Sequence, residues 1–205
     1  MKRDEKNLIS RQRILDSAVE EFGTQGYGLS SVNTICTAGN ISKGILYHYF
    51  KDKDELYLVC VKEMFDGLTA YLSKELADTS GTSAARLARY FDARLRFFGE
   101  YPLYHKLFCD AVIAPPTHLS AGIVQTKASF DTLNISVLTE LLQEVKLRED
   151  VSIETAVETF RLYQDFINAR YKMEPNRQVD PVQREQTCKR SLEILLYGVV
   201  TREGK

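Results

Sequence analysis

Four positions between residues 43 and 48 share one side of a short predicted helix. Lys43 and Tyr47 are four residues apart and are followed by Gly44 and His48, so this side offers one cation, one bare stretch of backbone and two flat polar rings. A lysine can donate to guanine acceptors or to phosphates, and an aromatic ring can contact thymine methyl groups. The bland alternative is a helix end whose aromatic residues are half-packed on a neighbouring helix.

A tight turn and a helix cap precede this face. Two short helices, over residues 31–38 and 42–49, are joined by about three residues, as a helix-turn-helix requires. Asn40 occupies the position that needs a left-handed backbone, and Gly39 before it allows a close approach. Ser42 is placed to cap the second helix. The residues that we expect to face inward are Val32, Ile35, Ile41, Leu46 and Phe50.

Lys51 and Lys53 follow the second short helix and lie beside the start of a longer helix. Asp52 and Glu55 have the spacing of a capping box, and the free amides of a helix start favour anions such as phosphate. This combination shifts the balance from the bland alternative towards nucleic-acid binding. The residues for which we predict DNA contacts are Ser31, Ser42, Lys43, Gly44, Ile45, Tyr47, His48, Lys51 and Lys53.

Helical periodicity dominates the rest of the chain, and no period-two strand pattern is evident. A first helix carries the apolar stripe Ile14, Leu15, Ala18, Val19 and Phe22 and should stop at the glycines of FGTQGYG. A long helix should start near residue 52 and end before the linker ADTSGTSA. Further helices are predicted over residues 84–98, 101–114, 120–147, 153–172 and 182–200, with breaks at Pro, Gly or charged runs. The expected fold is therefore all-α, with about nine helices.

Composition indicates an ordinary soluble protein. Of 205 residues, 44% are hydrophobic and 27% charged, and no apolar run approaches the ~20 residues of a membrane span. No apolar core of a signal peptide follows the N-terminus, and the four cysteines lie far apart, as free thiols in a reducing compartment do. We therefore expect a cytoplasmic protein with no membrane contact. Residues 1–53 hold eight bases and six acids against a net charge of −1 overall, an asymmetry too small to identify a DNA-binding end.

Residues 11–60, RQRILDSAVEEFGTQGYGLSSVNTICTAGNISKGILYHYFKDKDELYLVC, closely resemble the DNA-binding domain of the TetR (tetracycline repressor) family of bacterial regulators. The shared pattern runs from Ile-Leu-x-x-Ala through Gly-x-x-Gly-Tyr and Ser-Val-x-x-Ile to Ser-Lys-Gly-x-Leu-Tyr-x-Tyr-Phe. Two positions depart from it: Asn40 stands where Gly is usual, and Ile45 where a small polar residue often meets DNA. An exposed Ile45 would favour thymine methyl groups.

The resemblance implies a DNA-binding domain of three helices at residues 1–52, followed by a larger helical domain at 53–205. The larger domain would bind a small-molecule effector of unknown identity and form a homodimer through its last two helices. Two apolar stripes there permit a four-helix bundle between two chains, although both could pack within one chain. The predicted interface residues are Ile153, Val157, Phe160, Gln164, Ile167, Leu192, Leu195, Leu196 and Val199.

Aromatic residues concentrate after residue 89 and could line a pocket for a hydrophobic or aromatic effector, although aromatic stripes are more often core. The candidate effector residues are Phe97, Phe98, Tyr101, Tyr104, His105, Phe108, Phe130, Tyr163 and Phe166. His105 and Cys109 are four residues apart on one predicted helix, and two such ligands are too few for a metal site. We therefore predict no metal and no cofactor.

The function that these observations favour is a ligand-responsive transcriptional regulator. It would bind a palindromic operator in double-stranded DNA as a dimer, and it would act as a repressor that the effector releases. One alternative is a helical DNA-binding protein that responds to no effector. The other is a helical enzyme. The sequence contains no P-loop, G-x-S-x-G, G-x-G-x-x-G or H-E-x-x-H motif, which argues against this alternative.

Overall fold

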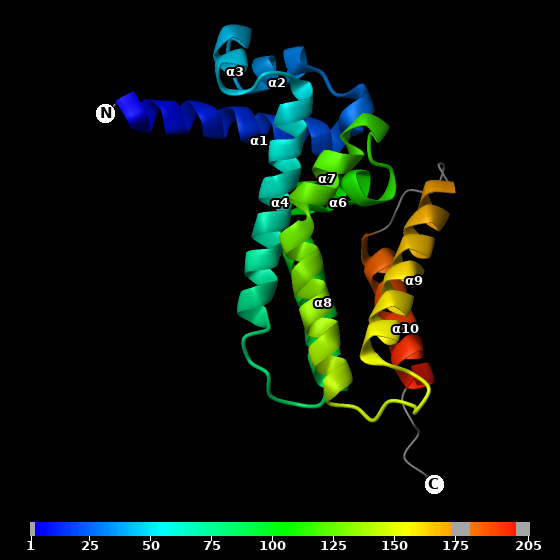
Figure 1. Cartoon of the computed structure of the whole chain (residues 1–205). Coiled ribbons are helices and arrows are strands. Elements are labelled where there is room, and N and C mark those ends of the chain that lie inside the picture. The colour runs from blue at the N-terminus through cyan, green and yellow to red at the C-terminus, as the bar shows by residue number, and fades with distance from the viewer. Residues whose placement is uncertain (1–2, 174–180, 200–205) are drawn as a thin grey trace. The chain divides into compact units, whose positions relative to one another are not determined.

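The computed structural model describes residues 3–173 and 181–199 of the chain. These residues form ten α-helices and one short 3-10 helix, with no β-strand among them, so the all-α prediction is confirmed (Figure 1). The elements are α1 Arg3–Leu29, α2 Val32–Ala38, α3 Lys43–Tyr49, α4 Lys53–Glu75, α5 Ser83–Glu100, α6 Pro102–Ile113, η1 Thr117–Leu119, α7 Ser120–Thr126, α8 Ala128–Gln143, α9 Ile153–Met173 and α10 Pro181–Val199.

The chain packs as two compact units, each built from two segments. The first unit combines Met1–Asp66 with Tyr101–Lys127, and the second combines Gly67–Glu100 with Ala128–Lys205. Helix α4 contributes residues to both units. This division by packing differs from the predicted boundary between residues 52 and 53, which is a boundary of function and stays a prediction.

In the first unit, α1 packs against α2, α3 and α6. Its predicted stripe is buried at Ile14, Leu15, Ala18 and Phe22. The ring of Phe22 meets that of Tyr57 from α4 edge to face, with centroids 5.1 Å apart. This core is what holds the short helices α2 and α3, which are too short to be stable alone.

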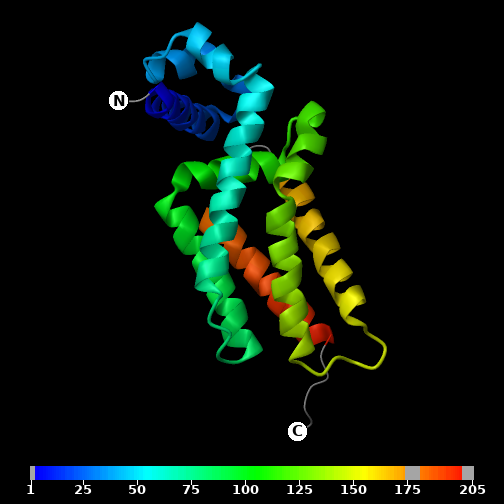
Figure 2. The same cartoon turned by 60° about the vertical axis from the view of Figure 1, so that its left-hand side comes forward.

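The second unit contains α5, α8, α9 and α10. Helix α5 packs against α8 and α10, and α9 packs against α8 and α10. Helices α9 and α10 pack against each other; they overlap in the view of Figure 1 and appear on either side of α8 in that of Figure 2. The residues that α5 buries recur every three or four positions, as expected of an amphipathic helix. They are Leu87, Tyr90, Phe91, Arg94, Phe97 and Phe98, with the small Ala93 also buried.

Two helix boundaries differ from the sequence prediction. Helix α1 does not stop at its first glycine but continues to Leu29 across a kink at Gly26, whose φ of 70° and ψ of 168° suit a residue without a side chain. The single helix predicted over residues 120–147 is in fact two helices, α7 and α8, with Lys127 (φ −89°, ψ 0°) between them. Thr126 Oγ1 donates to the carbonyl of Ile123 at 2.8 Å, which is a local alternative to a continuous helix.

Within the described residues, no single helix has the length and apolar character of a membrane span. Two helical segments that are bent by 89° relative to each other do meet these criteria when they are taken together, by length and composition only. They are Pro102–Ile113 and Thr117–Thr126.

Candidate nucleic-acid interface

The turn before α3 has the backbone that the sequence predicts. Asn40 adopts a φ of 49° and is the one described residue other than glycine with a positive φ, so the left-handed conformation is confirmed. A Cβ atom on Gly39 would lie 2.6 Å from both Ser17 Oγ and the Cδ1 atom of Ile41. A side chain at position 39 would therefore displace the ends of two neighbouring side chains.

Serine side chains cap both short helices. Ser31 Oγ accepts from the backbone N–H of Asn33 at 3.1 Å, and Ser42 Oγ accepts from that of Ile45 at 3.3 Å. These bonds satisfy amides that have no partner inside the helix, which fixes where α2 and α3 begin. The cap predicted at Ser42 is confirmed.

The inner and outer faces of α3 separate as the periodicity predicts. Leu46 is fully buried, and Phe50 at the end of the helix is 2% exposed. Ile35 of α2 is fully buried, whereas Val32 and Ile41 are only half-buried. On the outer face, the exposed residues are Lys43, Gly44, Ile45, Tyr47 and His48. The outer face thus remains accessible to a partner in the isolated chain.

The aromatic end of α3 is divided between two roles. Tyr47 is 50% exposed, His48 is exposed and Ile45 is 45% exposed. Tyr49 is half-buried, its hydroxyl donates to Asn7 of α1 at 3.2 Å, and its ring meets that of His48 at 5.1 Å. Tyr49 therefore supports the helix, while Tyr47 projects from it.

The two lysines after α3 differ in their surroundings. Lys51 is exposed, and its backbone N–H donates to Glu55 at 2.6 Å. Lys53 Nζ donates to the carbonyl of Ser30 at 2.9 Å and lies 4.2 Å from the ring centroid of Tyr27. These contacts make Lys53 a link between the end of α1 and the start of α4, a role that the sequence did not reveal.

Helix α4 begins with a hydrogen-bonded cap close to the one predicted. Asp52 Oδ1 accepts from the N–H of Glu55 at 2.8 Å. In return, Glu55 accepts from Lys51 rather than from Asp52, so the reciprocal bond is displaced by one residue. The cap is confirmed in its main bond.

A cluster around Tyr27 ties α1 to three other elements of the same unit. The hydroxyl of Tyr27 donates to Asp54 of α4, and His118 Nε2 of η1 lies 3.2 Å from both that hydroxyl and Asp54 Oδ2. The backbone N–H of Tyr27 donates to Asp110 of α6 at 3.2 Å. Burial and the neighbouring Asp54 raise the pKa of Tyr27 to about 12, so the phenol stays protonated and can donate. The tyrosine after Gly26 marks this site in the sequence, but its partners lie up to 91 residues away.

The candidate effector residues do not form one cluster within either unit. Tyr101, Tyr104, His105 and Phe108 belong to the first unit, and the other five belong to the second. Five of the nine are buried, namely Phe97, Phe98, His105, Phe108 and Phe130, whereas Tyr101 and Phe166 are 48% and 64% exposed. Their role in effector binding remains a prediction.

A cavity of 270 Å³ in the second unit lies elsewhere, and no candidate effector residue lines it. Its walls come from the start of α5, the end of α8 and from α10. Its lining is mostly apolar and comprises Thr82, Ser83, Ala84, Leu87, Leu141, Val145, Glu193 and Leu196.

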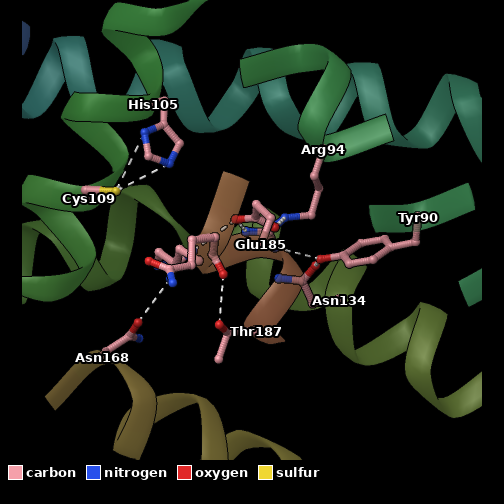
Figure 3. Close-up of polar contacts among 10 residues, drawn as sticks. Tyr90, Arg94, His105, Cys109, Asn134, Asn168, Glu185 and Thr187 are labelled. Carbon is pink, nitrogen blue, oxygen red and sulfur yellow. Dashed lines mark hydrogen bonds and ion pairs between the residues drawn. The ribbon is translucent and has the colours of Figure 1, made fainter. Parts of the chain in front are cut away.

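The second unit also buries a polar network that the sequence analysis missed. Arg94 of α5 lies beside Glu185 of α10, with Nε 2.8 Å from Oε2 (Figure 3). Arg94 also donates to the hydroxyl of Tyr90 at 2.9 Å, and that hydroxyl donates to Asn134 of α8 at 2.5 Å. A charged residue in the apolar stripe of α5, three and four positions from aromatic residues on both sides, is the sequence feature that could have revealed it.

The predicted dimer residues are placed unevenly. Phe160, Ile167 and Leu192 are buried within the chain, while Ile153, Val157, Gln164 and Leu196 are half-buried. The side chains of Leu195 and Val199 lie outside the described part of the structure. Three apolar side chains of α9 and α10 that the prediction omitted are well exposed, namely Leu162 at 62%, Phe166 at 64% and Ile194 at 63%.

His105 and Cys109 of α6 face each other, with Cys109 Sγ 3.5 Å from His105 Nε2 (Figure 3). Over residues 3–173 and 181–199, no three His, Cys, Asp or Glu side chains are grouped so that they could hold a metal ion.

The helix-turn-helix lies in the part of the chain that matches a known family. Residues 14–60, which include α2 and α3, match the sequence model of the family described as "Bacterial regulatory proteins, tetR family". Residues 14–60 thus carry the pattern of the TetR family's DNA-binding domain. The resemblance stated from the residues alone is thereby confirmed.

Two curated relatives of this chain are named as repressors. It is 31% identical over 83 residues to the HTH-type transcriptional repressor DhaR of Mycobacterium sp. (strain GP1), covering 40% of this chain and 42% of the relative. It is 35% identical over 72 residues to the HTH-type transcriptional repressor Rv1474c of Mycobacterium tuberculosis, covering 35% of this chain and 38% of the relative. The matches thus span about two fifths of each relative.

Solved structures share the fold over nearly the whole chain. The transcriptional regulator FadR from Bacillus subtilis, in complex with stearoyl-CoA, aligns with a TM-score of 0.69 over 92% of this chain and 99% of its own, at 20% identity. The regulatory protein TetR from Rhodobacter sphaeroides aligns with a TM-score of 0.64 over 89% of this chain and 98% of its own, also at 20% identity. At these identities the likeness concerns the fold.

Proposed function

We propose that this protein is a ligand-responsive transcriptional regulator of the TetR family that binds a palindromic operator as a homodimer. The observation that carries the proposal is the outer face of α3. Its side chains are exposed, while the opposite face is held by the fully buried Leu46 and the nearly buried Phe50. A helix held in this way can enter a major groove without disturbing its own core. We place the protein in the cytoplasm, where its operator would be.

Within this proposal, Lys43 and Tyr47 read or anchor the DNA. Lys43 would donate to a guanine edge or a phosphate, and Tyr47 would contact a thymine methyl group or the backbone. Ile45, exposed between them, would add an apolar contact to thymine. Ser31, Ser42, Gly44, His48, Lys51 and Lys53 complete the proposed surface, with Lys53 acting mainly by holding α4 against α1.

The second subunit in the proposal is another copy of this chain, and it covers the exposed face of α9 and α10. Thr155, Thr159, Leu162, Phe166 and Ala169 are exposed at alternating spacings of four and three, the period of a seam between packed helices. Ile194 adds an apolar residue on α10. The proposed interface therefore includes exposed residues that the interface predicted from the sequence did not contain. Two recognition helices would then enter successive major grooves about 34 to 36 Å apart.

The regulatory part of the proposal is release of DNA by a small effector bound to the C-terminal helices. A ligand can shift affinity for DNA only if it binds the two states of the protein differently. Helix α4 starts three residues after α3 and continues into the second unit, so it is the proposed lever that changes the separation of the recognition helices. The relatives named as repressors favour repression over activation.

The experiment is an operator titration with DNA that flanks the gene, searched first for a palindrome near a promoter. We expect one dimer to bind a palindromic fragment at least a thousandfold more tightly than a scrambled fragment of equal length. Equal affinity for both fragments would refute specific regulation. A dimer that binds specifically but is released by none of the compounds that bind beyond residue 80 would instead be an effector-independent DNA-binding protein. Turnover of such a compound would reveal an enzyme.

A further inference from the structure

The cavity of the second unit runs from an exposed mouth to a buried floor. Thr82 and Ala84, at the start of α5, are exposed, whereas Leu87 of α5 is 3% exposed and Leu141 of α8 is 1% exposed. An apolar cavity of roughly 150 Å³ can hold benzene, so a cavity of 270 Å³ has room for a phenyl ring and a short chain. The cavity can therefore take up a small ligand from solvent with its apolar end first.

Glu193 of α10 is the one ionisable residue in the lining of this cavity. It is half-buried, and it makes no hydrogen bond or ion pair with any other residue that the structure describes. A carboxylate that has lost part of its water and has no partner gains most from a group that is positively charged and donates hydrogen bonds. Glu193 thus gives a mostly apolar cavity one point that can orient a ligand.

The other charges near the mouth disfavour an anionic ligand. The hydroxyl of Ser83, which lines the cavity, donates to Glu144 at 2.9 Å. Glu144 forms an ion pair with Arg86, and Arg86 also pairs with Glu140 at 3.0 Å. This guanidinium is therefore already shared by two carboxylates. An anion at the mouth would meet Glu144 and Glu193, both of which would repel it.

We propose that this cavity binds the effector, and that the effector is a small amine, protonated at neutral pH, attached to an apolar body such as a phenyl or short alkyl group. This inference rests on the proposed function and names the chemical class of its effector. The ammonium group donates to the carboxylate of Glu193, and the apolar body lies against Leu87 and Leu141. Because α5, α8 and α10 all line the cavity, a ligand that fills it contacts three helices and stabilises one arrangement of them.

The test uses three probes that share a phenylethyl body: 2-phenylethylammonium, 2-phenylethanol and 3-phenylpropanoate. Binding to the whole protein is measured by calorimetry at pH 7. We expect the ammonium probe to bind at least about tenfold more tightly than either of the others, because only its head group is a cation. Equal affinity for the ammonium and the alcohol, or tighter binding of the carboxylate, would overturn the proposal.

A pair of variants tests the role of Glu193. Glu193→Gln keeps the size of the side chain but removes its charge, so 2-phenylethylammonium should bind at least about tenfold more weakly while 2-phenylethanol binds as before. Glu100→Gln is the matched control: it makes the same change at an exposed position at the opposite end of α5 and should alter neither affinity. Equal affinity of the two variants for the ammonium probe would refute the assignment of Glu193.

A second pair of variants tests whether the apolar body lies in the cavity. Ala84 lines the mouth, so Ala84→Phe should fill part of the cavity and weaken binding of both 2-phenylethylammonium and 2-phenylethanol at least about tenfold. Ala85, its exposed neighbour, does not line the cavity, and Ala85→Phe should leave both affinities unchanged. The same affinities in both variants would place the ligand elsewhere and overturn the proposal.

Operator binding, measured on the same preparations with and without 2-phenylethylammonium, separates this inference from the proposed function. Specific operator binding without a preference for the ammonium head group would sink the amine effector and leave the regulator standing. A preference that depends on Glu193, in a protein that binds no operator, would retain the amine site and sink the regulator. Binding of the ammonium probe that leaves operator affinity unchanged would overturn the assignment of this cavity to the effector.

Discussion

Within the first unit, the phenol of the buried Tyr57 donates a 2.8 Å hydrogen bond to the carboxylate of the half-buried Asp110. The same oxygen accepts from the backbone N–H of Tyr27 at 3.2 Å. One carboxylate thus joins α4, the kinked end of α1 and α6. Burial nevertheless raises the pKa of Asp110 above its usual value, because the two hydrogen bonds offset only part of the lost hydration. Burial and Asp110 together raise the pKa of Tyr57 as well.

The raised pKa of Asp110 gives its contribution to stability a definite pH dependence. Because the folded pKa exceeds the unfolded one, the contribution is fully present below about pH 3.9, the unfolded value, and is lost as the pH rises through the folded pKa. Asp110→Asn keeps an oxygen that can accept both bonds but cannot ionise. We therefore expect the free energy of unfolding of the natural protein, relative to Asp110→Asn, to fall as the pH rises above about 4 in urea titrations.

Asp78 provides a control of opposite sign. Its pKa is lowered by hydrogen bonding to Ser80, whose backbone N–H it accepts at 2.9 Å. The stability that it contributes is therefore present above the unfolded pKa and is lost as the pH falls through the folded pKa. Profiles of the same sign for Asp78→Asn and Asp110→Asn would contradict the assignment of burial as the dominant effect at Asp110.

The positive φ of Asn40 predicts how that position tolerates substitution. Asn40→Gly should leave the melting temperature nearly unchanged, because glycine adopts a φ of 49° without strain. Asn40→Val should cost about 1 to 2 kcal/mol, because a β-branched residue is strained there. Thr34→Val, at an exposed position inside α2, controls for valine itself. Equal melting temperatures for the two Asn40 variants would count against this account.

Alanine substitutions on the outer face of α3 should separate stability from DNA binding. Lys43→Ala and Tyr47→Ala should each change the free energy of unfolding by less than about 1 kcal/mol, since both side chains are exposed. If Lys43 reads a guanine edge, its loss should cost about 1 to 3 kcal/mol at one position of each half-site. If it holds a phosphate, binding should weaken for every sequence and the salt dependence should become shallower.

Leu46→Ala is the contrasting variant for that series, because Leu46 is fully buried on the inner face. It should cost about 2 to 5 kcal/mol of stability. Thermal melting and salt-dependent operator titration on all three variants complete the test. Strong destabilisation by Tyr47→Ala, with unchanged operator affinity of the folded fraction, would restore the view of α3 as a packed helix end.

The exposed face of α9 and α10 predicts the oligomeric state. Phe166→Asp should convert the dimer to a monomer in sedimentation equilibrium at micromolar concentration, because it places a charge where an apolar contact is proposed. Val124→Asp is a matched control on α7, where the natural side chain is 59% exposed. A natural protein that is already monomeric under these conditions and still binds its palindrome tightly would contradict the proposed dimer.

Many local features of this protein could be predicted from the chemistry of residues that are neighbours in the sequence. The two caps at Ser31 and Ser42, the left-handed Asn40 and the inner and outer faces of α3 all depend on residues within a few positions of one another. The apolar period of α5, α9 and α10 likewise gave their extents to within about two residues. Such features can be predicted because neighbours in a helix or turn have a fixed geometry.

Tertiary structure decided the features that join distant segments. The sequence could not show that Asp110 bonds Tyr27, that Lys53 is held by Ser30, or that Glu185 serves two arginines. Nor could it show that Phe160 and Ile167 are buried while Leu162 and Phe166 are exposed on the same helix. Apolar periodicity states that a helix has a buried side, but which neighbour buries it depends on how several helices pack together.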